Sequence, residues 1–345
     1  MLGGGVFVTQ NKVLPGSYIN FVNASKATAT VGDRGTVAIA LPLNKAPGTV
    51  INITRAEFIK DSENLLGYEY GDDEILALRE VFCHALRVYV YDLGEDGTVA
   101  DALAALEPYD FNVICAYTNV EDDVAQYISM VKSWRDDMGK KCQVVVYNEE
   151  SPDHEGVINV VSTISDEGVA DYALIAWVAG AEAGCKINES CTNMIYDGEL
   201  TVIVDKTQTQ LEACINTGQF AFHNVYGDVR VLDDINSLVT TTVDKGDDFK
   251  ANQTMRVVDQ IANDIAKLFN TKYLGKIPND KSGRVSLWAD IVAHHRQLQE
   301  IRAIENFDAE QVVVEQGNTK KAVVVTDVII PVNAMTQLYM TVVIQ

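Results

Sequence analysis

The chain has 345 residues, 47% hydrophobic and 22% charged, which fits two or three globular domains and excludes a disordered or fibrous chain. No apolar run reaches the roughly 18 residues that span a bilayer, and residues 1–12 lack the features of a secretory signal, so we expect folding in a cytoplasm. The net charge of −22 is concentrated between Asp61 and Asp171, where 25 acidic residues face 6 basic ones, and this disfavours nucleic acid and anionic membranes as partners.

The N-terminal segments are short and strand-like. Residues 1–28 predict an arm rather than a domain, because a GGG stretch at 3–5 is flexible and strand-like stretches flank the turn signal Pro15-Gly16. Residues 29–80 contain TVAIALPL and TVINI, separated by Gly, Pro and Asn, and predict a small β-rich unit.

Residues 81–198 predict an α/β domain. The runs LRVYVY, FNVICAY, CQVVVY and GVINVVS are continuously apolar and of strand length. Helical patterns lie between them, including one after residue 120 for which Asn119 is placed to cap the first turn. Strands that are apolar on both faces and joined by helices predict a mostly parallel sheet with helices packed on it.

Residues 199–320 predict an α+β domain, and residues 321–345 a C-terminal strand arm. The domain would contain a hairpin that turns at Gly227, two helices with apolar faces, and strands around a Gly317-Asn318 turn. The arm ends on LYMTVVIQ, which has no charge, proline or glycine and four β-branched residues in a row. It could close the sheet of its own chain or pair with a sheet edge of a neighbouring copy.

Motifs for catalysis or cofactor binding are not found. The first strand of the α/β pattern is followed by DLGEDG rather than a GxGxxG fingerprint, and GAEAGCK lacks the GK[ST] ending of a P-loop. The six cysteines have no CxxC spacing, and His294 and His295 are expected at a packing interface rather than at a metal. We therefore predict no catalytic, cofactor-binding or metal-binding residues, no cofactor and no enzyme. The alternative is a cytoplasmic α/β enzyme with an unrecognised active site.

One basic stretch opposes the acidic chain. Residues 267–284, KLFNTKYLGKIPNDKSGR, hold five basic residues and one acid. They form either a lysine-rich loop between two helices or a contact with an acidic partner surface.

Segments near both ends of the chain resemble those of a known protein family. VRVLDDINSL, MRVVDQIANDIAKLFNTKYLGKIPND and PVNAMTQLYMTVVIQ look like the C-terminal domain of contractile phage tail sheath proteins, and QNKVLPGSYINF with GDRGTVAIALPL is similar to their start. The likeness is to the compact branch found in phages and prophages of Gram-positive bacteria and in phage-tail-like bacteriocins. It covers about half of the chain closely, whereas the acidic middle agrees mainly in length and β/α order.

The resemblance implies a structural protein that polymerises helically, in stacked sixfold rings, around an inner tube. Contraction would then drive the tube through a cell envelope. The implied partners are other copies of the chain, the inner tail tube protein, and baseplate and tail terminator proteins, with no nucleic acid and no direct membrane insertion. The resemblance also implies a subtilisin-like but non-catalytic α/β domain that faces outward, and a phage or bacteriocin particle assembled in the host bacterial cytoplasm.

By position, the resemblance assigns residues to three contacts. The N-terminal arm between subunits would use Val6, Val8, Val13, Tyr18, Ile19 and Phe21. The C-terminal arm would use Leu338, Tyr339, Met340, Val342, Val343 and Ile344. The candidate contacts with the tube are Lys267, Lys272, Lys276, Lys281 and Arg284.

Overall fold

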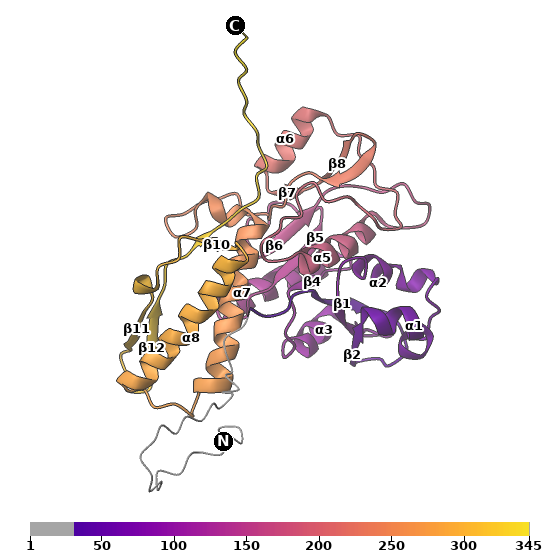
Figure 1. Ribbon diagram of the computed structural model, residues 1–345. Coiled ribbons are helices and arrows are strands. Elements are labelled where there is room, and N and C mark those ends of the chain that lie inside the picture. Colours follow the sequence, from indigo (N-terminus) through magenta and orange to yellow (C-terminus); the bar gives the residue numbers. More distant parts are fainter. Residues whose placement is uncertain (1–30, 345) are drawn as a thin grey trace, which may run out of the picture.

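The structure is a computed structural model, and it describes residues 31–344 of the chain. Its central feature is a seven-stranded β-sheet with the strand order β2-β3-β1-β4-β5-β6-β7 (Figure 1). Neighbouring strands are parallel, except that β2 lies antiparallel to β3 at one edge. The predicted mixed α/β fold with a mostly parallel sheet is therefore confirmed. The strands are β1 (Thr36–Leu41), β2 (Val50–Thr54), β3 (Arg87–Asp92), β4 (Val113–Cys115), β5 (Gln143–Tyr147), β6 (Val157–Val160) and β7 (Gln219–Phe220).

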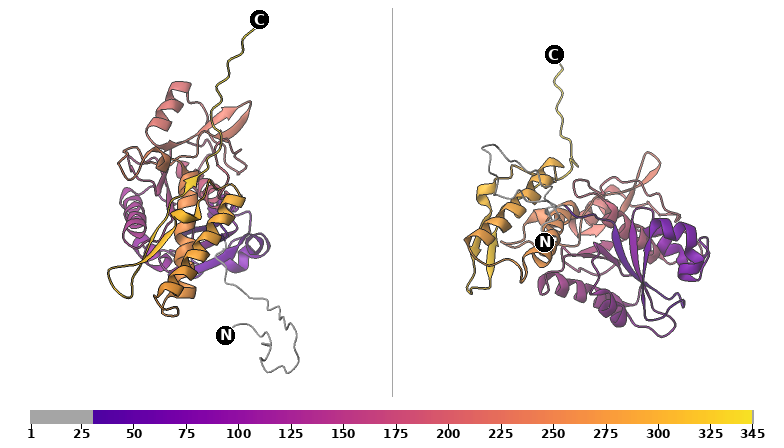
Figure 2. Two further views of the ribbon diagram at one scale, coloured as in Figure 1. Left: turned by 60° about the vertical axis from the view of Figure 1, so that its left-hand side comes forward. Right: turned by 60° about the horizontal axis from the view of Figure 1, so that its bottom comes forward.

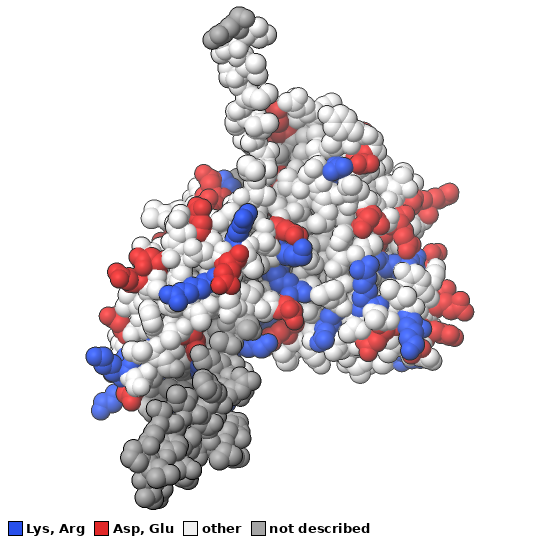
Figure 3. All heavy atoms as spheres, viewed as in Figure 1, with Lys and Arg blue, Asp and Glu red and all other residues white. Residues whose placement is uncertain are grey.

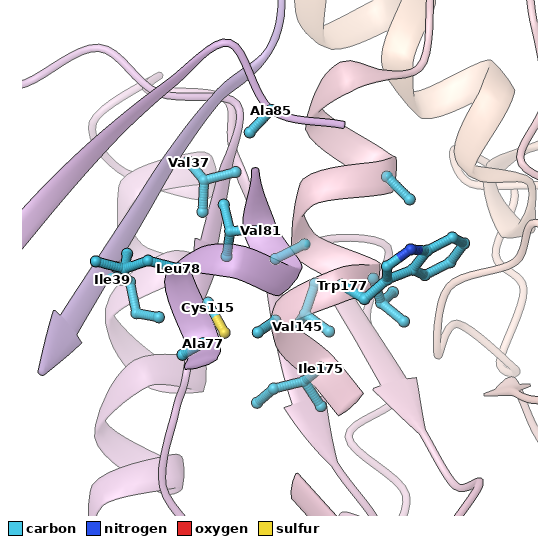
Figure 4. Packing of buried hydrophobic residues seen from close by; sticks show 14 of the residues in the cluster. Val37, Ile39, Ala77, Leu78, Val81, Ala85, Cys115, Val145, Ile175 and Trp177 are labelled. Carbon is cyan, nitrogen blue, oxygen red and sulfur yellow. The ribbon is translucent and has the colours of Figure 1, made fainter. Parts of the chain in front are cut away.

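Helices cover both faces of this sheet, because its strands carry apolar side chains on both faces. On one face Val37, Val81 and Trp177 belong to one buried cluster, and the side chains of Val37 and Val81 lie close together in Figure 4. On the other face Ala38 packs against two further helices. The first face is covered by α1 (Arg55–Leu66), α2 (Leu76–Val81) and α5 (Leu174–Gly184), and the second by α3 (Val99–Leu106) and α4 (Glu121–Asp136).

The two first strands lie in this main sheet, although residues 29–80 were expected to form a small β-rich unit. β1 lies between β3 and β4, with Val37 opposite both Val88 and Val113. Five of its six residues are buried, so the strand needs cover on both faces, and the main sheet supplies it. The helices α1 and α2, which follow directly, were not expected in this unit.

Helix α4 forms where its apolar spacing predicts, but the expected capping residue is wrong. Val120 is the N-cap, and no side chain caps the helix there. The Thr118 hydroxyl accepts the N–H of Val120 at 3.2 Å and thus fixes the entry into the helix, while Asn119 takes no part.

The C-terminal part stands beside the sheet and is built on two long helices, α7 (Asn252–Leu268) and α8 (Lys281–Glu300) (Figures 1 and 2). The predicted hairpin turn at Gly227 is confirmed, because Tyr226 and Gly227 both have positive φ between β8 and β9. A short helix, α6 (Gln208–Asn216), precedes this hairpin. The remaining strand pairs are β8 (Phe222–Val225) with β9 (Asp228–Val231), β10 (Ile304–Glu305) with β13 (Ile330–Pro331), and β11 (Val313–Gln316) with β12 (Val323–Thr326).

Helix α7 is joined to the sheet domain largely through buried polar groups. Arg256 is fully buried and pairs with Glu182 of α5 at 2.5 Å and with Asp234. Asp259 pairs with Arg135 of α4 at 2.6 Å. At the first residue of α7, Asn252 accepts a hydrogen bond from Gln143, and further along the helix Asn263 donates one to the carbonyl of Lys141. These contacts fix how the two parts meet.

Candidate interaction surfaces

The carboxylate of Asp92 lies at the end of the sheet where open α/β folds usually bind ligands, and its role there is structural. Such sites lie beyond the carboxyl ends of the parallel strands. Asp92 ends β3 there, is fully buried, and accepts backbone N–H groups at 2.6–3.2 Å. Burial alone would raise its pKa, but these hydrogen bonds outweigh it and lower the pKa of Asp92. The donors are the backbone N–H groups of Leu43, Asn44, Ala46 and Gly94. Because these bonds occupy the carboxylate, it has no free role in catalysis.

One cluster of potential metal ligands contains Asp136, His154 and Glu155. Its histidine has the wrong tautomer for a metal, because Gly156 donates its N–H to His154 Nδ1 at 2.9 Å. The ring proton of neutral His154 therefore sits on Nε2, which faces Asp136 at 3.5 Å and Glu155 at 3.7 Å. The Glu155 carboxylate also has a cation already, since Lys245 lies 2.6 Å away.

A second cluster, Glu182 with Cys191 and Asp234, also lacks room for a metal. The guanidinium of Arg256 bridges its two carboxylates and occupies the position of a cation. Burial raises the pKa of Glu182 well above its usual value, and the nearby Asp234 adds to this. Asp234 keeps a lowered pKa despite its burial, because Arg256 lies beside it. The cluster is a structural cross-link without a site for a ligand.

The five basic residues of the candidate tube contact are brought to one end of the α7–α8 pair, but most have partners there. Lys272 pairs with Asp290 of α8 at 2.5 Å. Lys276 donates to the carbonyl of Thr271, and Arg284 donates to the side chain of Asn279. Within residues 31–344, only the other two members of the set are exposed without a partner, namely Lys267 and Lys281.

A small cavity of about 100 Å³ lies beside this basic stretch. Its wall is mostly apolar and includes Phe269, Leu287 and Val323, and the charged side chains of Arg284 and Lys321 also line it. The sequence did not indicate this cavity, because its wall combines the turn after α7 with the β11–β12 hairpin.

The C-terminal segment is anchored at its root and exposed beyond it. Val332 donates its N–H to the carbonyl of Ala303, and Ala334 donates to Gln253 of α7 at 2.8 Å. From residue 335 onward the segment projects from the body, and it is free of charge in Figure 3. The exposed fractions of its large apolar side chains run from 70% to 100%, in Met335, Leu338, Tyr339, Met340, Val342, Val343 and Ile344.

The hairpin β11–β12 presents a second apolar surface, which was not predicted from the sequence. Val324 and Val325 of β12 are 52% and 39% exposed, and Val313 of β11 is 41% exposed. Nearby, Ile330 is 46% exposed. The uncharged run AVVV before Asp327 was the available signal. The six residues proposed for the N-terminal arm lie outside the described residues.

No helix within residues 31–344 has the length and apolar character needed to cross a membrane. The sequence matches two family models, the phage tail sheath protein central domain over residues 95–237 and the phage tail sheath C-terminal domain over residues 244–345.

Comparison with known proteins gives relatives of the same kind. The chain is 31% identical to the phage-like element PBSX protein XkdK of Bacillus subtilis over 255 residues, which cover 70% of this chain and 54% of that protein. It is 27% identical to the tail sheath protein of Clostridium phage phiCD119 over 225 residues, which cover 65% of this chain and 62% of that protein. The chain thus spans little more than half the length of these curated relatives.

Solved structures agree over nearly the full chain. A sheath tail protein from Desulfitobacterium hafniense is 26% identical, with a TM-score of 0.80 over 94% of this chain and 99% of that one. The contracted helical sheath of the anti-feeding prophage, 15% identical, shares the fold, with a TM-score of 0.73 over 96% of this chain and 99% of that one. The two family models together cover most of the sequence, and the chain belongs to the phage tail sheath family, a family of structural proteins rather than enzymes.

Proposed function

We propose that this chain is the structural subunit of a contractile tail sheath. Copies of it polymerise helically, in stacked sixfold rings, around an inner tube, with a baseplate at one end and a terminator at the other. Shortening of the polymer drives the tube through the envelope of a target cell. The particle is a phage or a phage-tail-like bacteriocin, assembled in the cytoplasm of its bacterial host. Membership of the sheath family supports this proposal.

The C-terminal segment links neighbouring subunits by adding a strand to a sheet edge of another copy. The observation that carries this is a root held on α7 by Gln253 and followed by a chain whose apolar side chains stay exposed. Along a strand, alternate residues share a face. One face of the donated strand would hold Leu338, Met340, Val342 and Ile344, whose burial in a neighbour provides the affinity. Residues 1–28 act as the second donated arm.

The hairpin β11–β12 is the acceptor that fits this strand best. It has only two strands, so each keeps one edge without a strand partner within the described residues. Its exposed valines, Val313, Val324 and Val325, offer an apolar surface beside those edges. An added strand would cover both the edge and the valines.

The other parts of the chain face either the inner tube or the outside of the sheath. The strand arms flank an α+β C-terminal domain over 199–320 that faces the tube, and its exposed Lys267 and Lys281 contact an acidic tube surface. The acidic α/β domain over 81–198 faces outward, with a subtilisin-like topology and no protease activity. The occupied carboxylate of Asp92 supports the lack of catalysis.

Deletion of residues 338–345 tests the strand link. Because these side chains are exposed, we expect the melting temperature of the subunit to stay unchanged, while negative-stain electron microscopy finds no long hollow cylinders. Tyr226→Ser removes an equally exposed side chain at the tip of the β8–β9 hairpin and should leave cylinders intact. Normal cylinders from the truncated chain would refute strand donation, and a fall in the melting temperature would mean that the segment stabilises its own subunit.

Reversal of two charges tests the tube contact. The double variant Lys267→Glu with Lys281→Glu changes the exposed, unpaired lysines and spares the Lys272–Asp290 pair, so the subunit should fold normally. We expect it to form no sheath on purified tubes in a pelleting assay. The control, Arg55→Glu with Lys60→Glu, makes the same charge change on exposed residues of α1 and should co-sediment normally. Equal sedimentation of both variants would contradict the assignment.

A further inference from the structure

The cavity between the turn after α7 and the β11–β12 hairpin reaches the molecular surface through apolar side chains. Two members of its wall, Leu274 and Ile277, are 58% and 40% exposed. Deeper in the wall lie the buried Leu287 of α8 and the half-buried Val323 of β12. A hollow lined in this way offers water few hydrogen-bond partners, so it favours an apolar occupant.

Hydrogen bonds within the chain hold the wall of this cavity in place. The side chain of Asn279 donates to the carbonyls of Lys320 and Ala322, at 3.1 and 2.8 Å, and thereby ties the tip of the hairpin to the turn. On the other side, the Tyr273 hydroxyl donates to Asp290 of α8. An occupant therefore meets a preformed site, and little free energy is spent on ordering the wall.

The volume of the cavity selects the size of the occupant. An apolar cavity of about 150 Å³ in another protein takes up benzene. The volume here is smaller, about 100 Å³, which suits a branched aliphatic side chain such as that of leucine better than an aromatic ring.

The rim of this cavity is basic. Residues 267–284 hold five basic residues and residues 317–323 add two, whereas the only acid in both stretches is Asp280. The carboxylate of Asp280 already caps the first turn of α8. Two of the cations, Arg284 and Lys321, line the cavity itself. The charge of the rim therefore favours an aliphatic group that has carboxylates beside it.

The terminal segments of this chain match the cavity less well. Residues 1–30 contain two lysines and no acid, so the basic rim repels them. Residues 335–344 are uncharged, and their root is held by Ala303, beyond the other end of α8 (Figure 1). The 20 residues of α8 separate this root from the cavity by about 30 Å.

We propose that the cavity receives one aliphatic side chain of the inner tube subunit, and that carboxylates beside this side chain pair with Lys281 and Lys321 at the rim. Burial of the aliphatic group provides most of the affinity, while the charges orient the two surfaces. This inference rests on the proposed tube contact, and it adds an apolar anchor to that contact.

The full-length subunit tests the cavity in the absence of any tube. The probe is 4-methylpentanoate, which joins a leucine-like chain to a carboxylate. In methyl NMR, we expect saturable shifts of the Leu287 and Val323 methyl groups with a Kd of about 1–10 mM. Acetate keeps the carboxylate but lacks the aliphatic chain, and it should bind at least about tenfold more weakly. Unchanged methyl shifts up to about 50 mM 4-methylpentanoate would overturn the proposal.

Two matched variants test whether the tube uses the cavity. Leu274→Asp places a carboxylate in the wall, and Val285→Asp makes the same charge change on α8 outside the wall. The two natural side chains are 58% and 54% exposed, so both variants should fold with an unchanged melting temperature. In the pelleting assay with purified tubes, we expect Leu274→Asp to lose at least about tenfold in affinity and Val285→Asp less than about threefold.

The outcomes separate this inference from the proposed function. If both variants co-sediment like the natural chain, or if both lose the same affinity, the cavity is not an anchor and the inference fails, while the tube contact is still judged by the Lys267→Glu with Lys281→Glu variant. If Leu274→Asp also abolishes the cylinders that the subunit forms without tubes, the occupant is another copy of the chain and the assignment to the tube is overturned. If the natural chain itself does not co-sediment with tubes, the proposed tube contact fails, and the inference falls with it.

Discussion

Arg256→Met should destabilise the subunit strongly, because within residues 31–344 Arg256 is the only cation that pairs with two buried carboxylates. Among the described residues, no other basic side chain forms an ion pair with Glu182 or Asp234. The side chains of these acids are 0% and 2% exposed. Breaking a buried pair by removing one partner costs about 3–5 kcal/mol. For a domain of about 150–250 residues each kcal/mol shifts the melting temperature by about 2–4 °C, so we expect a fall of about 6–20 °C.

The variant should also acquire a characteristic pH dependence. The pKa of Glu182 is already raised by burial, and removal of Arg256 takes away the main group that lowers it. A carboxyl group whose pKa is raised in the folded state binds protons more readily there than in the unfolded chain. Protonation of this group therefore makes the folded protein more stable as the pH falls. We therefore expect the melting temperature of Arg256→Met to recover part of its loss between about pH 8 and about pH 5.

Thermal unfolding followed by circular dichroism checks both effects. The double variant Arg256→Met with Glu182→Gln removes the proton-binding group and should be more stable than the single variant at about pH 8. Lys186→Met breaks an exposed ion pair with Glu189 and serves as the control, with no measurable change. A single variant that melts within about 2 °C of the natural chain, or one that gains nothing from Glu182→Gln or from acid, would refute the reasoning.

Two further predictions concern the sheet domain. Asp92→Asn should cost about 1–3 kcal/mol, because the new amide group turns a donor toward a backbone N–H such as that of Ala46. The natural chain should lose this stabilisation as the pH falls through the lowered pKa of Asp92, whereas the variant should not, and urea unfolding at several pH values measures the difference. Gly180→Ala should cost about 1–3 kcal/mol, because its Cβ would lie 2.3 Å from the carbonyl oxygen of Val81 between α5 and α2. Gly246→Ala is the control, because a Cβ added at Gly246 would meet no neighbouring atom within 4 Å. It should leave the free energy of unfolding unchanged in the same urea titration.

The sheet could be predicted because its strands are apolar on both faces, and this pattern survives without knowledge of distant partners. The run LRVYVY became β3, and CQVVVY became β5. The position of β1 in the middle of the sheet could not be read in the same way, since strand order depends on crossovers between distant segments, which leave no local pattern in the sequence. Helix α1 was missed because its apolar residues are few, with only Phe58 and Leu66 as buried hydrophobic side chains.

The surfaces were predicted unevenly. The exposed C-terminal segment stood out because its last eight residues contain no charge, proline or glycine. The cross-links of α7 gave no signal, because Arg256 meets acids 74 and 22 residues away in the sequence. For the same reason, the sequence did not reveal that Lys272 would be neutralised by Asp290, 18 residues further along. Long-range electrostatic pairs depend on tertiary geometry, whereas apolar periodicity is local.

The polar joint along α7 determines how the subunit responds to torque. Apolar surfaces can slide past each other with little change in energy, but hydrogen-bonded charge pairs depend on direction and resist small rotations. The bidentate ion pair of Arg135 with Asp259, with hydrogen bonds of 2.6 and 2.9 Å, resists rotation in this way. We therefore expect a rotation of the helices α7 and α8 to be passed on to the sheet domain through these ion pairs, so that the two parts turn together.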